Sequence, residues 1–243
     1  MIPKVIHYCW FGKGELPDLA KKCIASWKKF MPDWEIKEWN EENFDVNQIQ
    51  YTKEAYENKK YAFVADFARF YVLEKYGGVY MDVDVELIRP LDDLLHNKTI
   101  LGFERAGKVN PGLICASEAN TLFLNEMIDV YKTLKFLGND GNLNITTIVE
   151  YTTNYLITKG LTNSNRIQLI GETIIYPIDY FCPIDMITNE LIITKNTYSI
   201  HHFAASWLSP WQKVKKRIRK IVGGKIYNAL HRFKSKLKNK NYK

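Results

Sequence analysis

Residues 60–87 constrain the fold of this chain more than any other segment, because three local structures follow one another without a spacer. Residues 60–76 include the run YAFVADFARFYVLEKY, which is apolar nearly all round and therefore predicts a buried helix. Gly77 and Gly78 come next, and glycine is the usual residue just beyond a helix end. Residues 79–87 then alternate between apolar and polar side chains, which is the period of a β-strand. A buried helix that leads directly into a strand is typical of an α/β domain.

The alternating segment carries Asp82, Asp84 and Glu86 at every second position. In a strand these three carboxylates would share one face, with neighbours about 6.5–7 Å apart. At an effective dielectric constant near 20, two carboxylates at this distance repel by about 2.4 kcal/mol. A shared cation would remove the repulsion, whereas on a solvated edge strand water would screen it. The buried residues that precede the acids favour the shared cation.

The predicted buried helix has only two charged residues before its last turn, Asp66 and Arg69. Their spacing of three places them on one helix face. One interpretation is an ordinary intrahelical ion pair. Burying charges is costly without further partners, however, so a functional pair is the alternative. Asp66 would then accept hydrogen bonds from ligand hydroxyls, and Arg69 would bind an anion.

The remaining pattern predicts one mixed, mostly parallel sheet covered by helices on both faces, because strands and helices alternate through the first half. Strands are expected at residues 4–10, 34–39, 79–87, 99–104, 112–117, 167–169, 173–176 and 197–202. Helices are expected at 18–30, 60–76, 119–136 and 146–158, with a loop or a weak helix at 40–52.

The segment SIHHFAASW, residues 199–207, contains two adjacent histidines. Neutral imidazole is a common ligand of divalent metal ions. On a strand His201 and His202 point to opposite faces, so at most one of them can join the acids. Both are otherwise structural residues of the strand. Trp207 is either a core residue or part of a pocket wall.

The basic charge of the chain belongs to its C-terminal end. The formal net charge of the whole chain is +7. Residues 212–243 hold thirteen Lys and Arg and no acidic residue. Residues 1–211 therefore carry 21 basic and 27 acidic side chains, a formal charge of −6. We therefore divide the chain into a catalytic-type domain at 1–210 and a basic tail at 211–243. Apolar residues from Val214 onward fall at helical spacing, which predicts an amphipathic helix on an anionic membrane surface. Contact with a nucleic acid or with a partner protein is the alternative.

Cysteine usage favours a cytoplasmic protein, and the basic tail would place it peripherally on the inner face of the membrane. The four cysteines are scattered and match no zinc spacing, as expected for reduced thiols. We see no signal peptide and no run long enough to span a bilayer.

Several motifs of nucleotide enzymes are missing from the sequence. It contains no G-x-x-x-x-G-K-[ST] loop, no G-x-G-x-x-G fingerprint and no G-x-S-x-G elbow. A ligand that bears a phosphate would therefore have to be held by a metal ion and arginine.

Three motifs together resemble one known family. The run ADFARFYVLEKYGGVYMDVDVE resembles the signature of the family 32 glycosyltransferases, which include bacterial capsular and surface polysaccharide sugar transferases and yeast initiating mannosyltransferases. It is also similar to the corresponding block of the clostridial glucosylating toxins. The opening IPKVIHYCWFG and the later H-x-x-x-SW extend the resemblance over roughly residues 1–207. The resemblance implies a GT-A fold, a nucleotide-sugar donor, a divalent ion (Mn²⁺ or Mg²⁺) and retention of the anomeric configuration.

The resemblance also implies roles for the acidic residues and their partners. Asp84 would coordinate the ion directly, and Asp82 would reach the ion or the donor ribose. Asp66 would hold hydroxyls of the donor sugar, while Arg69 would contact the sugar or the diphosphate. Either His201 or His202 would complete the metal site, and the resemblance favours His201.

Further residues would contact the rest of the donor. Tyr8 and Trp10 would flank the base, and Tyr80 would pack beside it. Ser206 and Trp207 would reach the diphosphate. These assignments complete the expected donor site.

The expected function is transfer of a hexose or an N-acetylhexosamine from a UDP-sugar to a glycan or lipid-linked oligosaccharide, in capsular or surface polysaccharide synthesis. Two alternatives stay open at this point. One is a metal-dependent phosphohydrolase or nucleotidyltransferase, which also uses paired acids. The other is a non-catalytic protein that binds membranes or nucleic acid, although no nucleic-acid partner is expected.

Overall fold

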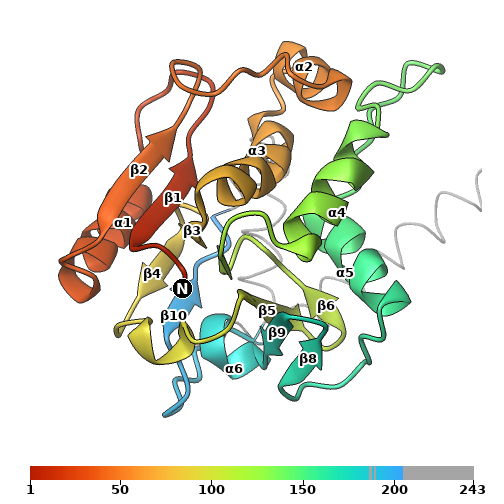
Figure 1. Ribbon diagram of the computed structural model, residues 1–243. Helices are drawn as coiled ribbons and strands as arrows, with labels where there is room; N and C mark the ends of the chain where they lie inside the picture. Colours follow the sequence, from red (N-terminus) through yellow and green to blue (C-terminus); the bar gives the residue numbers. More distant parts are fainter. Residues whose placement is uncertain (186–187, 189, 205–243) are drawn as a thin grey trace, which may run out of the picture. The chain divides into compact units, whose positions relative to one another are not determined.

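The computed structural model describes residues 1–185, 188 and 190–204. The chain divides into two compact units, one made of Met1–Pro183 with Ile193–Phe203 and the other of Ile184–Ile192 with Ala204–Lys243. The helices and strands described below all belong to the first unit (Figure 1). Ser206, Trp207 and the basic tail at 211–243 lie outside the described residues.

The centre of the first unit is a mixed sheet of eight strands. The strands are β1 (Val5–Cys9), β2 (Glu35–Trp39), β3 (Gly78–Tyr80), β5 (Thr99–Arg105), β6 (Lys108–Val109), β7 (Cys115–Ser117), β8 (Gln168–Ile170) and β9 (Thr173–Tyr176). Their order is β2-β1-β3-β7-β5-β9-β8, and β6 pairs with β5 outside this path. The strands β1, β2, β3, β5 and β9 run in one direction, and the other three oppose them. The expected mostly parallel mixed sheet is thus confirmed.

Helices cover both faces of this sheet, as expected from the alternating pattern (Figure 1). They are α1 (Asp18–Phe30), α2 (Gln50–Glu57), α3 (Tyr61–Tyr76), α4 (Leu122–Lys132), α5 (Ile148–Thr158) and α6 (Ile178–Phe181), together with a 3-10 helix at Asp92–Leu94. None of these helices is long and apolar enough to cross a membrane, in the part of the chain that the structure describes.

Two hydrophobic clusters lie on opposite faces of the sheet. Successive residues of one strand enter different clusters: Leu101 of β5 packs with α2–α5, whereas Ile100 packs with Trp27 and Met31 at the end of α1. This alternation follows from strand geometry, since neighbouring side chains point to opposite faces. The sheet is therefore buried on both sides, which fixes its position between the helices.

The period-two segment is not one strand, contrary to the sequence-based prediction. β3 ends at Tyr80, and β4 (Val85–Leu87) begins after a turn in which Val85 N–H donates to the Asp82 carbonyl, 3.0 Å away. β4 leaves the large sheet and pairs antiparallel with β10 (Ser199–His201). Tyr80, which precedes Asp82 by two residues in the same alternation, is buried. The chain changes sheets here because distant segments supply its hydrogen-bonding partners.

Other predicted elements differ from the structure mainly at their ends. The helix α2 lies at 50–57, where the expected loop or weak helix at 40–52 covered only its beginning. The strand expected at 112–117 is reduced to β7, because residues 110–113 form a turn closed by Leu113 N–H on the Asn110 carbonyl. The short elements β6 and α6 were not predicted.

Candidate functional site

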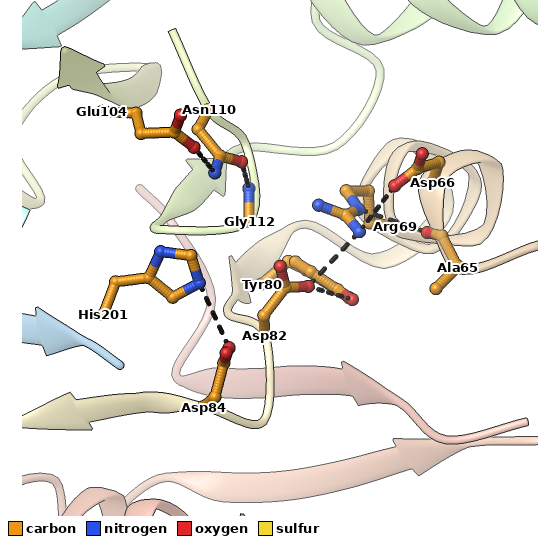
Figure 2. A network of polar contacts seen from close by, with 10 residues as sticks. All are labelled: Ala65, Asp66, Arg69, Tyr80, Asp82, Asp84, Glu104, Asn110, Gly112 and His201. Atoms are coloured by element: carbon orange, nitrogen blue, oxygen red, sulfur yellow. Dashed lines mark hydrogen bonds and ion pairs between the residues drawn. The ribbon is translucent and has the colours of Figure 1, made fainter. Parts of the chain in front are cut away.

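The turn between β3 and β4 brings two aspartates to one histidine of β10 (Figure 2). Asp82, Asp84 and His201 each offer a ligand atom, and these atoms lie within 4.8 Å of one another. His201 Nε2 lies 3.2 Å from Asp84 Oδ1. His201 is buried, whereas the Asp82 side chain is 30% exposed to solvent. The cluster is thus reachable from solvent through Asp82.

The two adjacent histidines point in different directions, as expected on a strand. His201 faces Asp84, whereas His202 Nε2 lies 2.8 Å from Glu86 Oε2. Glu86 also forms an ion pair with Lys22 at 2.8 Å. Glu86 therefore turns away from the other two acids, and His201 is the histidine near Asp82 and Asp84.

Charge between these groups shapes the protonation of His201. Burial by itself lowers the pKa of His201, but Asp84 outweighs this effect and raises the pKa to about 10. The neighbouring Asp84 carboxylate thus favours the protonated imidazole. A metal ion would take the place of that proton between the same two side chains.

Arg69 joins the helix α3 to the acidic turn. Its Nη2 lies 3.0 Å from Asp66 Oδ1 and 3.3 Å from Asp82 Oδ1. The guanidinium stacks over the Tyr80 ring, 4.6 Å from the ring centroid, and Tyr80 Oη donates to Asp82 Oδ1 at 3.0 Å. Arg69 is buried, and its Nη1 has no hydrogen-bond partner. An unpartnered buried guanidinium nitrogen is costly, and an anion that reached it would satisfy it.

Asp66 shares Arg69 with Asp82 and is buried beside it. Burial raises the pKa of Asp66 to about 7, against the lowering effect of Arg69. The predicted pair of Asp66 and Arg69 therefore exists, and it has the further charged partner that its burial required.

A turn ahead of β7 forms another wall of the site, and the sequence analysis did not identify it. The Gly112 carbonyl accepts a hydrogen bond from Asp82 N–H at 2.9 Å. Asn110 Oδ1 accepts from Gly112 N–H, and Asn110 Nδ2 donates to Glu104 Oε2, both at 2.7 Å (Figure 2). The Pro-Gly pair at 111–112 was a readable turn signal, but nothing local connects it to Asp82.

The residues expected around the donor base lie at the carboxyl ends of β1 and β3. Tyr8 is buried against Trp27 and donates its hydroxyl to Glu38 Oε2 at 2.6 Å. Trp10 is half-buried, and its Nε1 donates to the Gly14 carbonyl at 2.6 Å. Tyr80 lies beneath Arg69 rather than on an open surface. Their predicted roles toward a base stay predictions.

The donor set of the cluster fits a divalent metal ion. Two carboxylates and one imidazole are hard and borderline ligands that suit Mn²⁺, Mg²⁺ or Zn²⁺. The three side chains converge without any rearrangement of the backbone. Asp82, Asp84 and His201 are therefore the residues that would hold such an ion.

A family model matches the helix, the glycine pair and the acidic turn. Residues 17–101 match the model described as "Glycosyltransferase sugar-binding region containing DXD motif". The match covers about a third of the chain. Asp82 and Asp84 are its D-x-D motif, and the DXD region also contains Asp66 and Arg69. The expected resemblance is confirmed over this part of the chain.

Curated relatives match about two fifths of this chain. The chain is 36% identical over 103 residues to inositol phosphoceramide mannosyltransferase 3 of Schizosaccharomyces pombe, which covers 39% of this chain and 28% of that protein. It is 32% identical over 99 residues to mannosyl phosphorylinositol ceramide synthase SUR1 of Saccharomyces cerevisiae, covering 39% and 26%. The matches thus span less than a third of either relative.

Solved structures confirm the glycosyltransferase fold of the GT-A type. PaToxG glycosyltransferase superposes with a TM-score of 0.52 at 17% identity, covering 65% of this chain and 69% of that one. A glycosyltransferase involved in glycosylation of the major capsid of PBCV-1 gives a TM-score of 0.52 at 10% identity, covering 84% and 95%. At these identities the likeness concerns the fold.

Proposed function

We propose that this protein is a metal-dependent, retaining glycosyltransferase that moves a hexose or an N-acetylhexosamine from a nucleotide-sugar to a glycan or lipid-linked acceptor. The observation that carries the proposal is the convergence of Asp82, Asp84 and His201 next to buried Arg69. Both aspartates and the arginine lie inside the DXD region. A UDP-sugar is the first donor to consider. The printed names of the relatives make mannose a donor sugar to test as well.

Arg69 and the metal-binding residues would both act on the diphosphate of the donor. Breaking a sugar–diphosphate bond leaves negative charge on the departing phosphate, and a positioned cation stabilises it. The Nη1 of Arg69, which lacks a protein partner, is suited to that charge. A divalent ion held by Asp82, Asp84 and His201 would supply a second positive charge when bound.

Asp66 suits the sugar of the donor. One of its oxygens is held by Arg69, so the carboxylate orientation is fixed before a ligand arrives. A fixed carboxylate can accept hydrogen bonds from two adjacent hydroxyls of a pyranose. Substitution of Asp66 should therefore affect sugar selection more than metal binding.

The acceptor is proposed from chemistry and from the relatives. Inositol phosphoceramide, in the names of several relatives, is a membrane lipid with a polyhydroxylated head group. An acceptor of this class would be met at a bilayer, which agrees with the predicted amphipathic tail. A cytoplasmic location at the inner membrane face and a role in capsular or surface polysaccharide synthesis remain part of the proposal.

A thermal-shift screen of UDP-, GDP- and dTDP-sugars, each with and without Mn²⁺, tests the proposal. A ligand at about 100 times its Kd stabilises the native state by about 2.7 kcal/mol, which corresponds to a rise in Tm of about 5–10 °C for a domain of this size. We expect such a rise with one nucleotide-sugar, and only when Mn²⁺ is present. The protein should then hydrolyse that donor slowly without an acceptor.

Asp84→Asn and Asp93→Asn form a matched pair for this screen. Asp84 belongs to the proposed metal site, whereas Asp93 is exposed in the 3-10 helix. The first variant should lose the Mn²⁺-dependent shift, and the second should retain it. A shift of equal size in Asp84→Asn would remove the basis for the proposed metal site.

A further inference from the structure

The carboxylate of Asp82 rests against a glycine. A Cβ atom added to Gly112 would lie 2.1 Å from Asp82 Oδ2 and 2.9 Å from Asp82 Cγ. The Asp82 amide also donates to the Gly112 carbonyl. Arg69 and Tyr80 contact the other carboxylate oxygen, Oδ1. The position of the Gly112 backbone therefore sets where Asp82 can lie.

Asn110 holds the Gly112 backbone in place. Its Oδ1 accepts from Gly112 N–H, its own N–H donates to the Gly102 carbonyl, and its carbonyl accepts from Leu113 N–H. The residue is buried, so its side-chain amide needs a partner for Nδ2 as well. Glu104, at the end of β5, is that partner. Its carboxylate can only accept, so it fixes which way the Asn110 amide points.

We propose that Glu104 is a positioning residue of the active site, acting through Asn110 and Gly112 on Asp82. The chain of contacts runs from the Glu104 carboxylate through the Asn110 amide and the Gly112 N–H to the atoms that support Asp82 (Figure 2). Without Glu104 the buried Nδ2 of Asn110 loses its acceptor. The turn at 110–112 then gains alternative arrangements, and Asp82 loses its fixed position.

Hydrogen–deuterium exchange of the Asp82 and Gly112 amides tests this without reference to activity. Both amides donate hydrogen bonds in this chain of contacts, so their protection from exchange shows whether these bonds are formed. In Glu104→Ala we expect exchange at both amides to be about tenfold faster, as for loss of a hydrogen bond to a charged acceptor. Glu104→Gln keeps an acceptor oxygen for Asn110 Nδ2 and should stay close to the wild type.

Titration of Mn²⁺ into the same proteins adds a second readout, which rests on the proposed function. Loss of an outer partner of a metal ligand weakens binding by about tenfold or more, so Glu104→Ala should bind Mn²⁺ about tenfold more weakly and Glu104→Gln within twofold to threefold of the wild type. Glu172→Ala is the matched control. The Glu172 side chain is exposed, and its backbone carbonyl accepts a hydrogen bond from Thr99 N–H at the start of β5. It should change neither readout.

The outcomes separate this inference from the proposed function. If the wild type binds no Mn²⁺, the metal site fails, and the exchange rates still decide the role of Glu104. Wild-type exchange in Glu104→Ala would overturn the inference, as would fast exchange in Glu104→Gln, since the hydrogen bond would then not be the cause. If Glu104→Ala folds poorly, Asn110→Asp takes its place: it sets a carboxylate against Glu104 and should exchange at both amides about tenfold faster than the wild type, and wild-type exchange would overturn the inference.

Discussion

His7 is a buried histidine, and each of its two ring nitrogens forms a hydrogen bond that suits the neutral imidazole. Its Nε2 lies 2.9 Å from the Gly77 carbonyl, and Trp39 Nε1 donates to its Nδ1 at 3.0 Å. Because Nδ1 accepts a hydrogen bond, the proton must reside on Nε2, which donates to Gly77. Protonation of Nδ1 would break the bond from Trp39. His7 thereby ties β1 to β2 and to the glycine after α3.

Because of His7, the free energy of unfolding should decrease as the pH is lowered. Burial lowers the pKa of His7 to about 4, below the ordinary value of 6.5 that applies to the unfolded chain. Between these values the unfolded state binds more protons than the folded state, so the stabilisation is complete above pH 6.5 and is lost as pH falls toward 4. From pH 7 to pH 5 the loss is about 2 kcal/mol.

Urea unfolding of the wild type and of His7→Gln at pH 7 and pH 5 measures this contribution. Carboxylates that titrate in the same range cancel in the comparison, so the variant should lose about 2 kcal/mol less between the two pH values. The exposed His96, changed to Gln, is the control. Equal losses in wild type and His7→Gln would contradict the interpretation.

At the scale of elements, the junction between α3 and β3 depends on glycine. Gly78 has φ +107°, and a Cβ there would lie 2.7 Å from the Val5 carbonyl oxygen and 3.0 Å from His7 Nε2. Val5 and His7 belong to β1, which pairs with β3. The close approach of backbone to backbone is what allows the helix to turn directly into the sheet.

Gly78→Ala should therefore destabilise the protein by more than about 2 kcal/mol, because backbone strain and a contact with a rigid strand combine. Gly141→Ala separates the two effects, since Gly141 also has positive φ but nothing lies within 4 Å of its Cβ position. That variant should cost about 1 kcal/mol. Urea unfolding curves decide the matter, and equal costs would mean that the contact with β1 is unimportant.

The elements that could be predicted are those defined by local pattern. The apolar run and the glycine pair identified α3 and its end, because both signals lie within the segment itself. The alternation at 79–87 was misleading, since it records polarity and not hydrogen-bonding partners. Residues 81–84 form a turn because Gly112 and β10 supply partners from elsewhere in the chain.

The same distinction applies to the site as a whole. Asp66, Arg69, Asp82 and Asp84 lie within twenty residues of one another, so one motif identified them. Glu104, Asn110 and Gly112 come from a separate segment, and their contact with Asp82 exists only after folding. The resemblance favoured His201 over His202, but the contact of His201 with Asp84 depends on the pairing of β10 with β4, which nothing local in the sequence shows.

The charge distribution of the whole molecule leads to the last prediction. A body with a formal charge of −6 would be repelled by an anionic membrane, whereas the thirteen basic residues at 212–243 would be attracted to it. Each basic residue near such a surface contributes about 1 kcal/mol. Substitution of Lys215, Lys216 and Lys220 by Gln should thus weaken binding to phosphatidylserine-containing vesicles by about 3 kcal/mol, or more than about a hundredfold.

The matched control removes the same charge from the body. Lys21, Lys28 and Lys29 are exposed on α1, and their replacement by Gln lowers the net charge by the same three units. Vesicle co-sedimentation at low salt should show the loss in the tail variant alone, and high salt should release the wild type because exposed charges are screened. Equal weakening in both variants would mean that the net charge of the protein determines binding. The prediction that the tail is an amphipathic membrane anchor would then be wrong.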